Sequence, residues 1–254
     1  MMVVLGLLFV LGGFIAYLIL LFGLRRFTYR TWMFDSFVGV GAVLAIIGWA
    51  IGGSRIVAFT AVLLGAAWFL VSRRELKLAG SERLRLRRGD RIPSFTTLTT
   101  DSKQVTEQHV IAKAPALLVL YRGWWCPSSK SQLDELVRGY ERLHQAGLAI
   151  FAGSVDGPDE AIPLQQRVGD KITILCSVSE SLLDEVGVRD QRGAPWYDRI
   201  LYGAARQDIS MPAALVIDVS GRITFAFRST RLDHWVRVAD ILLFSSQSKE
   251  AKRP

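Results

Sequence analysis

The sequence predicts two parts of different fold class: an all-α region of three transmembrane helices and, after it, an α/β domain whose mixed central sheet is flanked by helices. Three observations predict this division. Half of the 254 residues are hydrophobic, and the excess lies almost entirely before Val71. Beyond that point strand-like and helix-like segments alternate, and the last two strands form a hairpin. We therefore expect a transmembrane anchor at 1–72, a basic juxtamembrane linker at 73–91, the α/β domain at 92–247 and a disordered tail at 248–254.

Three apolar runs make up the N-terminal region. The first, 3–24, has no charged residue and is long enough to cross a bilayer as a helix. The other two, 36–53 and 56–72, are separated by a short turn that contains Arg55. A secretory signal would carry basic residues ahead of its apolar core, and none precedes the first run. Gly48 and Gly52 form a small-xxx-small pair that permits close helix contact. The lipid bilayer is therefore an expected partner.

Basic residues orient this anchor. Arg25, Arg26 and Arg30 follow the first run, and residues 73–91 hold eight basic and three acidic side chains. Because positive charge is enriched on cytoplasmic loops, both stretches reach the cytoplasm only if the N-terminus is outside and three spans are present. We expect a multi-pass protein of the cell (inner) membrane with its α/β domain in the cytoplasm. Residues 92–254 carry equal numbers of acidic and basic side chains, so nucleic acid is not an expected partner.

Apolar runs and turn residues place the elements of the α/β domain. We expect strands at 95–100, 116–121, 148–153 and 172–175, a hairpin of 213–218 and 222–227, and helices over 127–145 and along the face of Leu232, Trp235, Ala239 and Leu242. The continuous apolar runs 116–121 and 148–153 are typical of buried parallel strands. Trp196, Tyr197 and Tyr202 lie in an irregular stretch, 188–210, that we interpret as a loop on the substrate side.

The stretch Tyr-Arg-Gly-Trp-Trp-Cys-Pro at 121–127 is the most informative part of the sequence. It leads from a buried strand into a helix, so we expect Cys126 at the helix N-terminus and Pro127 in the first turn. Unpaired N–H groups and the positive end of the helix dipole stabilise thiolates at such positions. The thiolate is the nucleophilic form of cysteine, so we interpret Cys126 as the reactive residue. The alternative is a half-buried structural cysteine.

Three blocks follow one another along the α/β domain: Gly-Asp-Arg-Ile-Pro-Ser-Phe at 89–95, the Cys126 motif, and Met-Pro at 211–212 leading into Ala-Ala-Leu-Val-Ile-Asp and the Ser-Gly turn at 220–221. This ordered set resembles the peroxiredoxin-like branch of the thioredoxin superfamily, the alkyl hydroperoxide reductase and thiol-specific antioxidant (AhpC/TSA) proteins, over about 89–245. The resemblance implies a thioredoxin-like fold and an antioxidant oxidoreductase that reduces a peroxide or a disulfide. It also implies an external thioredoxin- or glutathione-like reductant, and Pro212 in the family's cis-proline position beside the reactive sulfur.

The sequence departs from this family at three positions. Ser129 replaces the second cysteine of Cys-Pro-x-Cys, which excludes a disulfide within the motif. Gly123 stands where peroxiredoxins have a threonine three residues before the cysteine. Pro212 stands in place of their active-site arginine, and Arg122 or Arg228 is the alternative source of positive charge.

Two further residue types complete the candidate site. Trp124 and Trp125 are candidates to shield the sulfur and contact a partner, or they merely pack; Trp125 is the better candidate. Cys176, at the end of the strand 172–175, is either a resolving thiol for Cys126 or a small buried apolar residue. The two cysteines and three histidines have no metal-ligand spacing, so we expect neither a metal nor a cofactor.

The leading functional hypothesis is therefore a membrane-anchored thiol-redox protein with one reactive cysteine. Its candidate site residues are Cys126, Pro212, Trp125, Arg122 and Ser129, with Cys176 as the candidate resolving thiol. One alternative is a redox-inactive binding module that keeps the thioredoxin fold, which an unreactive Cys126 would favour. Another is a membrane assembly factor in which the spans are the functional part, which a dispensable soluble domain would favour.

Overall fold

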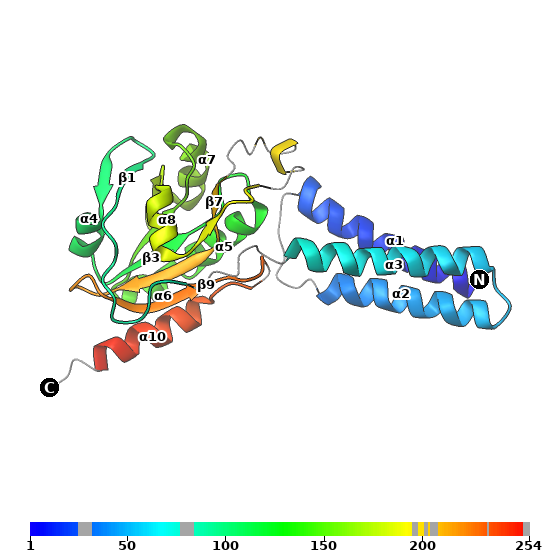
Figure 1. The fold of residues 1–254 in the computed structure, drawn as a ribbon. Helices are drawn as coiled ribbons and strands as arrows, with labels where there is room; N and C mark the ends of the chain where they lie inside the picture. Colours follow the sequence, from blue (N-terminus) through cyan, green and yellow to red (C-terminus); the bar gives the residue numbers. More distant parts are fainter. Residues whose placement is uncertain are drawn as a thin grey trace. The chain divides into compact units, whose positions relative to one another are not determined.

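The computed structural model describes residues 1–24, 32–76, 84–194, 198–200, 203, 208–232 and 234–250. By its internal contacts the chain divides into two units, Met1–Lys77 and Leu78–Pro254 (Figure 1). Several residues named above lie outside the described ranges: Arg25, Arg26 and Arg30, residues 77–83 of the predicted linker, and Trp196, Tyr197 and Tyr202.

Three helices form the first unit. Helix α1, Met2–Leu18, continues as the π-helical stretch η1, Ile19–Gly23; α2 spans Trp32–Ala50 and α3 spans Arg55–Leu76. Helix α2 and the Arg55–Arg73 part of α3 are long and apolar enough to cross a membrane, whereas α1 is a shorter apolar helix of 17 residues. Helix length and composition therefore support two of the three predicted spans.

Glycines let α1 and α2 pack with their backbones in contact. A Cβ on Gly6 would lie 2.6 Å from the carbonyl oxygen of Gly41, and a Cβ on Gly41 would lie 2.7 Å from that of Gly6. Gly48 lies in the same way against Val3, but Gly52 has a φ of 93° and nothing near it. The predicted Gly48–Gly52 contact pair is thus wrong for Gly52, because the chain has left the helix there to turn into α3.

A polar contact joins α2 to α3. The indole N–H of Trp68 donates a hydrogen bond to the carboxylate of Asp35 at 2.9 Å. Tyr17 of α1 packs edge-on against the Trp68 ring, with 5.0 Å between ring centroids. All three helices therefore meet at this buried tryptophan.

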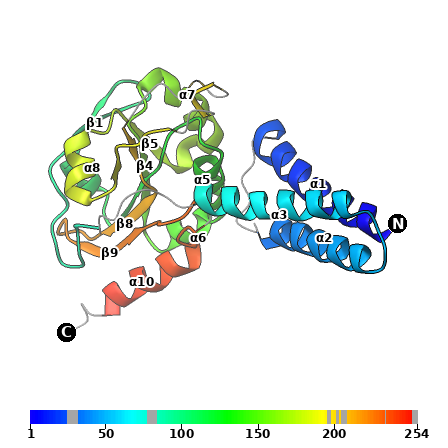
Figure 2. The same cartoon turned by 45° about the vertical axis from the view of Figure 1, so that its right-hand side comes forward.

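A seven-stranded sheet with the order β2-β1-β5-β4-β3-β8-β9 is the centre of the second unit (Figures 1 and 2). Its strands β3, β4 and β5 are parallel, and the remaining pairs are antiparallel. This confirms the predicted mixed central sheet. The strand bounds are β1 Thr96–Thr99, β2 Gln104–Thr106, β3 Ala116–Leu120, β4 Ala149–Gly153, β5 Thr173–Cys176, β8 Ala213–Ile217 and β9 Ile223–Arg228, while β6 Arg189–Asp190 and β7 Ile209–Ser210 form a separate pair.

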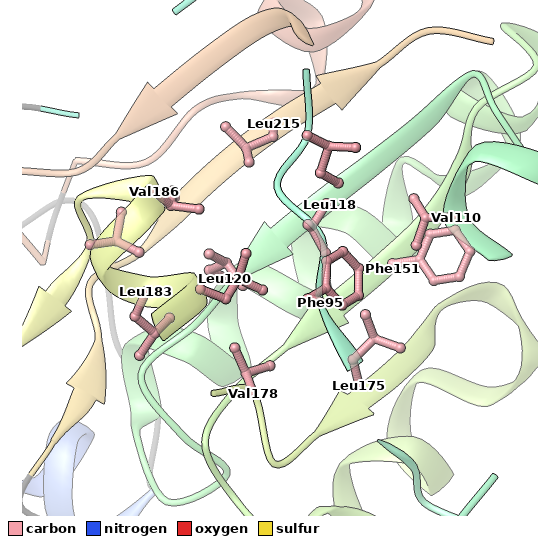
Figure 3. Packing of buried hydrophobic residues seen from close by; sticks show 14 of the residues in the cluster. Phe95, Val110, Leu118, Leu120, Phe151, Leu175, Val178, Leu183, Val186 and Leu215 are labelled. Atoms are coloured by element: carbon pink, nitrogen blue, oxygen red, sulfur yellow. The ribbon is translucent and has the colours of Figure 1, made fainter. Parts of the chain in front are cut away.

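Helices flank this sheet. They are α4 Glu107–Ala112, α5 Pro127–Arg138, α6 Tyr140–Gln145, α7 Pro158–Val168, the 3-10 turn η2 Gly169–Lys171, α8 Glu180–Val186 and α10 Val238–Glu250. All five residues of β3 are buried, as expected of a central strand that is covered on both faces. On one face Leu118 and Leu120 of β3 gather with Leu215 of β8 and with Leu183 and Val186 of α8 (Figure 3).

Two predicted helices have different bounds in the structure. The helix expected over 127–145 is broken at Gly139 into α5 and α6, because Gly139 lies against Val238 with no room for a side chain; a Cβ there would lie 2.7 Å from a methyl of Val238. The closing helix begins at Val238 rather than near Leu232, because the Ser229 hydroxyl bonds to the carbonyl oxygens of Arg231 and His234 and holds this segment in a turn.

The closing helix also runs further than predicted. It extends to Glu250, three residues into the expected tail of 248–254. Phe244 of α10 stacks on Phe225 of β9 at 4.7 Å between ring centroids, so the helix is fastened to the edge of the sheet (Figure 2).

The carboxyl ends of β3, β4 and β5 lie side by side at one edge of the sheet. The backbone N–H of Tyr121 donates to the carbonyl oxygen of Gly153 at 3.0 Å, and that of Ser154 donates to Leu175 at 3.1 Å. The residues that follow these three strands therefore meet, as they do at the ligand-binding edge of other open α/β sheets. These are the segments 121–126, 154–156 and 176–178.

Candidate functional site

Cys126 lies at the N-terminus of α5, where the sequence predicts it. It is the N-cap residue, with φ −75° and ψ 118°, and Pro127 follows in the first turn. Its N–H donates to the carbonyl oxygen of Gly123 at 3.2 Å, and its own carbonyl oxygen accepts from the N–H of Lys130 at 3.1 Å. The first bond closes a tight turn over 123–126, and the second begins the helix.

The sulfur is enclosed. Cys126 is 2% exposed, Trp125 3% and Arg122 5%. Both cysteines are free thiols. In this conformation the sulfur is not accessible to the surface of a folded partner protein.

Arg122 is a buried cation four residues before the thiol. Its guanidinium carbon lies 5.3 Å from the centroid of the Trp125 ring, and its Nε has no hydrogen-bond partner. Among the described residues no carboxylate forms an ion pair with it. A buried charge without a partner is costly, so Arg122 is placed to attract negative charge at this site.

Ser129, in the position of the missing cysteine, has a structural contact. It is fully buried, and its hydroxyl oxygen accepts a hydrogen bond from the backbone N–H of Arg122 at 3.2 Å. This bond ties the end of the β3 segment to the first turn of α5. It therefore helps to hold the 123–126 turn in place.

Asp156 stabilises the 123–126 turn through a hydrogen bond. This carboxylate is 4% exposed and accepts hydrogen bonds from the backbone N–H of Trp124 at 2.7 Å and from the hydroxyl of Ser154 at 2.8 Å. The sequence analysis missed both residues. The signal was present, because Ser154 and Asp156 directly follow a buried strand whose carboxyl end faces Cys126. Trp124 itself is partly exposed, with the Lys130 ammonium 5.5 Å from its ring centroid.

Cys176, unlike Cys126, lies at the end of a strand and near a carboxylate. It ends β5, is fully buried, and its backbone oxygen accepts a hydrogen bond from the hydroxyl of Thr97. Burial, and then the negative charge of Asp156, raises the pKa of Cys176 to about 12. The same two causes raise the pKa of the Tyr121 phenol well above its ordinary value. At neutral pH Cys176 is protonated, which makes it a weak nucleophile in this conformation; its role as a resolving thiol stays a prediction.

Pro212 lies at the same edge of the sheet, but the peptide bond before it is not cis as expected. Because Leu120 pairs with Ala213, the register places Pro212 across from Tyr121. The cis peptide bond seen in the described residues is Ala114–Pro115, and the Met211–Pro212 bond is trans. The predicted cis-proline is therefore wrong: the carbonyl of Pro212 instead accepts the N–H of Ser229 at 2.8 Å, which starts the β8–β9 ladder.

Two other features bear on the chemistry. Arg228, the alternative source of positive charge, donates from Nη1 to the carbonyl oxygen of Gly187 at 3.2 Å, so its side chain is engaged with the backbone before β6. In the described part of the chain, no group of three His, Cys, Asp or Glu side chains is arranged to hold a metal ion.

The comparison with known families agrees with this geometry. A profile described as the AhpC/TSA family matches residues 88–226, more than half of the chain. The chain belongs to the AhpC/TSA family. Membership confirms the expected enzyme class, a thiol oxidoreductase of the peroxiredoxin type.

Solved structures show the same fold in the second unit. Peroxidoxin BcpB from Mycobacterium tuberculosis is 12% identical with a TM-score of 0.51, covering 66% of this chain and 99% of its own. Peroxiredoxin 5 from Alvinella pompejana is 18% identical with a TM-score of 0.53, covering 64% of this chain and 99% of its own. A cysteine-to-serine mutant of peroxiredoxin 6 from Arenicola marina is 14% identical with a TM-score of 0.56, covering 66% of this chain and 76% of its own. No curated protein matches the chain.

Proposed function

We propose that this protein is a membrane-anchored thiol peroxidase in which Cys126 is the single reactive cysteine. The observation that carries the proposal is an enclosed thiol at a helix N-terminus, four residues after Arg122, a buried cation without a carboxylate partner among the described residues. A helix N-terminus and a nearby cation are the surroundings in which reactive cysteines typically occur. The enclosure favours a small peroxide over a protein disulfide as the substrate.

The reaction uses the chain's own groups. The Cys126 thiolate attacks the terminal oxygen of the peroxide, so that an S–O bond forms as the O–O bond breaks. The other oxygen leaves as hydroxide or alkoxide and takes up a proton, and Cys126 becomes a sulfenic acid. Arg122 stabilises negative charge first on sulfur and then on the departing oxygen.

An external thiol completes the cycle. One thioredoxin- or glutathione-like thiol condenses with the sulfenic acid to give a mixed disulfide and water, and a second thiol releases Cys126. The chain lacks an evident internal substitute, because the hydroxyl of Ser129 is not a competent nucleophile toward sulfur and the thiol of Cys176 is buried and protonated. Since Cys126 is enclosed, the reductant reaches it when the 123–126 turn opens.

The first unit is proposed as the membrane anchor. Helices α2 and α3 have the length and apolarity of spans, and α1 with η1 forms one continuous run of helical backbone from Met2 to Gly23 that is long enough to serve as the third. With three spans and the basic stretches on the cytoplasmic side, the proposed topology has the N-terminus outside and the peroxidase domain in the cytoplasm.

The test is the reaction of the full-length chain, purified in detergent, with hydrogen peroxide and then with glutathione or thioredoxin. We expect peroxide consumption and a sulfenic acid on Cys126, no consumption by Cys126→Ala, and consumption by Cys176→Ala, which changes a buried thiol outside the reaction. A wild-type protein that leaves peroxide and disulfides unchanged would instead identify a redox-inactive binding module.

A further inference from the structure

The Trp125 indole occupies the space that a side chain at position 123 would fill. A Cβ built on Gly123 would be closest to Nε1 of Trp125, at less than contact distance, with Cδ1 at 2.9 Å and Cε2 at 3.1 Å. Gly123 is not among the glycines with positive φ, so its backbone conformation is open to other residues. Glycine is required here for space rather than for backbone freedom.

The same indole also contacts the Arg122 side chain. The guanidinium packs on the Trp125 ring at 5.3 Å, which is within the range of a cation–π contact. This contact is the one interaction of the guanidinium found among the described residues, and its Nε is a buried donor without an acceptor. The position of the positive charge therefore depends on where the ring lies.

Two hydrogen bonds hold the backbone of Arg122 and Gly123 in place. Cys126 donates to Gly123 across the turn, and Arg122 donates to the Ser129 hydroxyl on the first turn of α5. The side chain of Trp125 thus folds back within a closed turn that ends at Cys126. Moving the ring would move the guanidinium without breaking either bond.

We propose that Gly123 and Trp125 form one unit: the indole fills the space left by the missing side chain of Gly123, and the ring in this position holds the Arg122 guanidinium in the segment that leads to Cys126. Trp125 is then a positioning residue that acts through Arg122. The inference rests on the proposed function in one respect, that Cys126 works as a thiolate. It predicts that positions 123 and 125 are coupled.

The test is a double-mutant cycle on the full-length chain in detergent, in a Cys176→Ala background so that Cys126 is the one thiol. The variants are Gly123→Ala, Trp125→Ala and the double variant, and the readouts are the pH dependence of iodoacetamide alkylation and the peroxide kcat/KM. We expect Gly123→Ala alone to displace the ring, raise the midpoint pH of alkylation by about one unit and lower kcat/KM about 10-fold.

In the Trp125→Ala background the same Gly123→Ala change should alter both readouts less than about 2-fold, because no ring remains to be displaced. Trp124→Ala provides the matched control, because the Trp124 ring contacts Lys130 rather than Arg122. The effects of Trp124→Ala and Gly123→Ala should therefore be additive. Trp125→Phe keeps an aromatic face for Arg122 and should retain more activity than Trp125→Ala.

Three results would overturn the inference. If Gly123→Ala changes neither readout, the Trp125 ring does not depend on the space at position 123. If Gly123→Ala lowers activity equally with Trp125 present and in the Trp125→Ala background, the substitution acts through the backbone and not through the ring. A lower rate with an unchanged alkylation midpoint would show that the ring shields the sulfur without placing a charge. If Trp125→Ala does not fold, Trp125→Leu replaces it in the cycle. Coupled alkylation without peroxide turnover would support the unit and reject the proposed function.

Discussion

The two cysteines show how strongly burial and neighbours set the chemistry of one residue type. Both are almost inaccessible, yet Cys126 caps a helix four residues after the buried cation of Arg122, whereas Cys176 ends a strand near the carboxylate of Asp156. Helix N-termini are typical positions of reactive cysteines, whereas burial and the Asp156 carboxylate raise the pKa of Cys176. Burial and the neighbouring carboxylate together therefore make Cys176 the poorer nucleophile.

Mild oxidation should trap the wild-type protein as mixed disulfides with small or protein thiols, because the hydroxyl of Ser129 does not displace a partner from Cys126. Non-reducing gels and mass spectrometry measure these species. Cys126→Ala should remove them, whereas Cys176→Ala should leave them or increase them. Bands that persist in Cys126→Ala and vanish in Cys176→Ala would mean that Cys176 is the reactive sulfur.

Alkaline pH should destabilise the fold through Cys176. Its pKa is raised from an ordinary 9.0 to about 12, so between these values the folded state keeps a proton that the unfolded chain loses. The corresponding stability is fully present below about pH 9 and is lost as the pH rises towards 12, by up to about 1.4 kcal/mol per pH unit.

Urea unfolding of wild type and Cys176→Ala at about pH 8 and about pH 10.5 measures this loss. The wild type should lose more stability over this range than the variant. Burial and the charge of Asp156, the two largest causes of the raised Tyr121 pKa, are present in both proteins, so most of the difference belongs to Cys176. Equal losses would contradict the raised pKa.

Ser129→Cys should add dithiol–disulfide activity, because it places a second sulfur one helical turn after Cys126. Insulin reduction by the full-length variant measures the gain. Ser128→Cys is the matched control, since Ser128 is also buried in the first turn but one position too early. No gain in a folded Ser129→Cys protein would mean that the loss of the hydrogen bond to Arg122, or the enclosure of the site, outweighs the restored spacing.

At the scale of the elements, close helix approach decides the packing of the first unit. Gly6 and Gly41 bring the backbones of α1 and α2 together, so even a methyl group between them has no space. Membrane helices associate through such contacts, because lipid removes the hydrophobic drive that water supplies.

Gly41→Ala should therefore lower the stability of the chain in detergent by roughly 1–3 kcal/mol, because its Cβ meets the backbones of Gly6 and Val10. Gly39→Ala, on the same helix with nothing within 4 Å, should be neutral or slightly stabilising. Thermal unfolding of the two purified variants compares them. Equal midpoints would show that α1 and α2 do not pack in this way.

At the scale of the whole molecule, the proposed orientation in a membrane predicts the redox surroundings of the site. An alkaline phosphatase fusion after Gly53, in the turn between α2 and α3, should be active outside the cytoplasm, and a fusion after Gly80 should be inactive. An active Gly80 fusion would place the second unit in an oxidising compartment, where a disulfide between Cys126 and Cys176 becomes a reasonable product.

The sequence by itself determined the features that local pattern encodes. Apolar runs marked β3, β4 and the N-terminal helices, because burial on both faces requires unbroken hydrophobic segments. The strand–Trp-Cys-Pro–helix order placed Cys126 at a helix N-terminus, and the ordered blocks indicated the AhpC/TSA family.

Only the tertiary structure decided what depends on contacts between distant segments. The break at Gly139 comes from Val238, the support of the 123–126 turn comes from Asp156, and the high pKa of Cys176 comes from burial beside that carboxylate. The trans Met211–Pro212 bond was likewise seen only in the structure. The packing of the Trp125 ring against Gly123 involves two residues that are close in the sequence. It still required the structure, because the sequence does not show in which direction a side chain points.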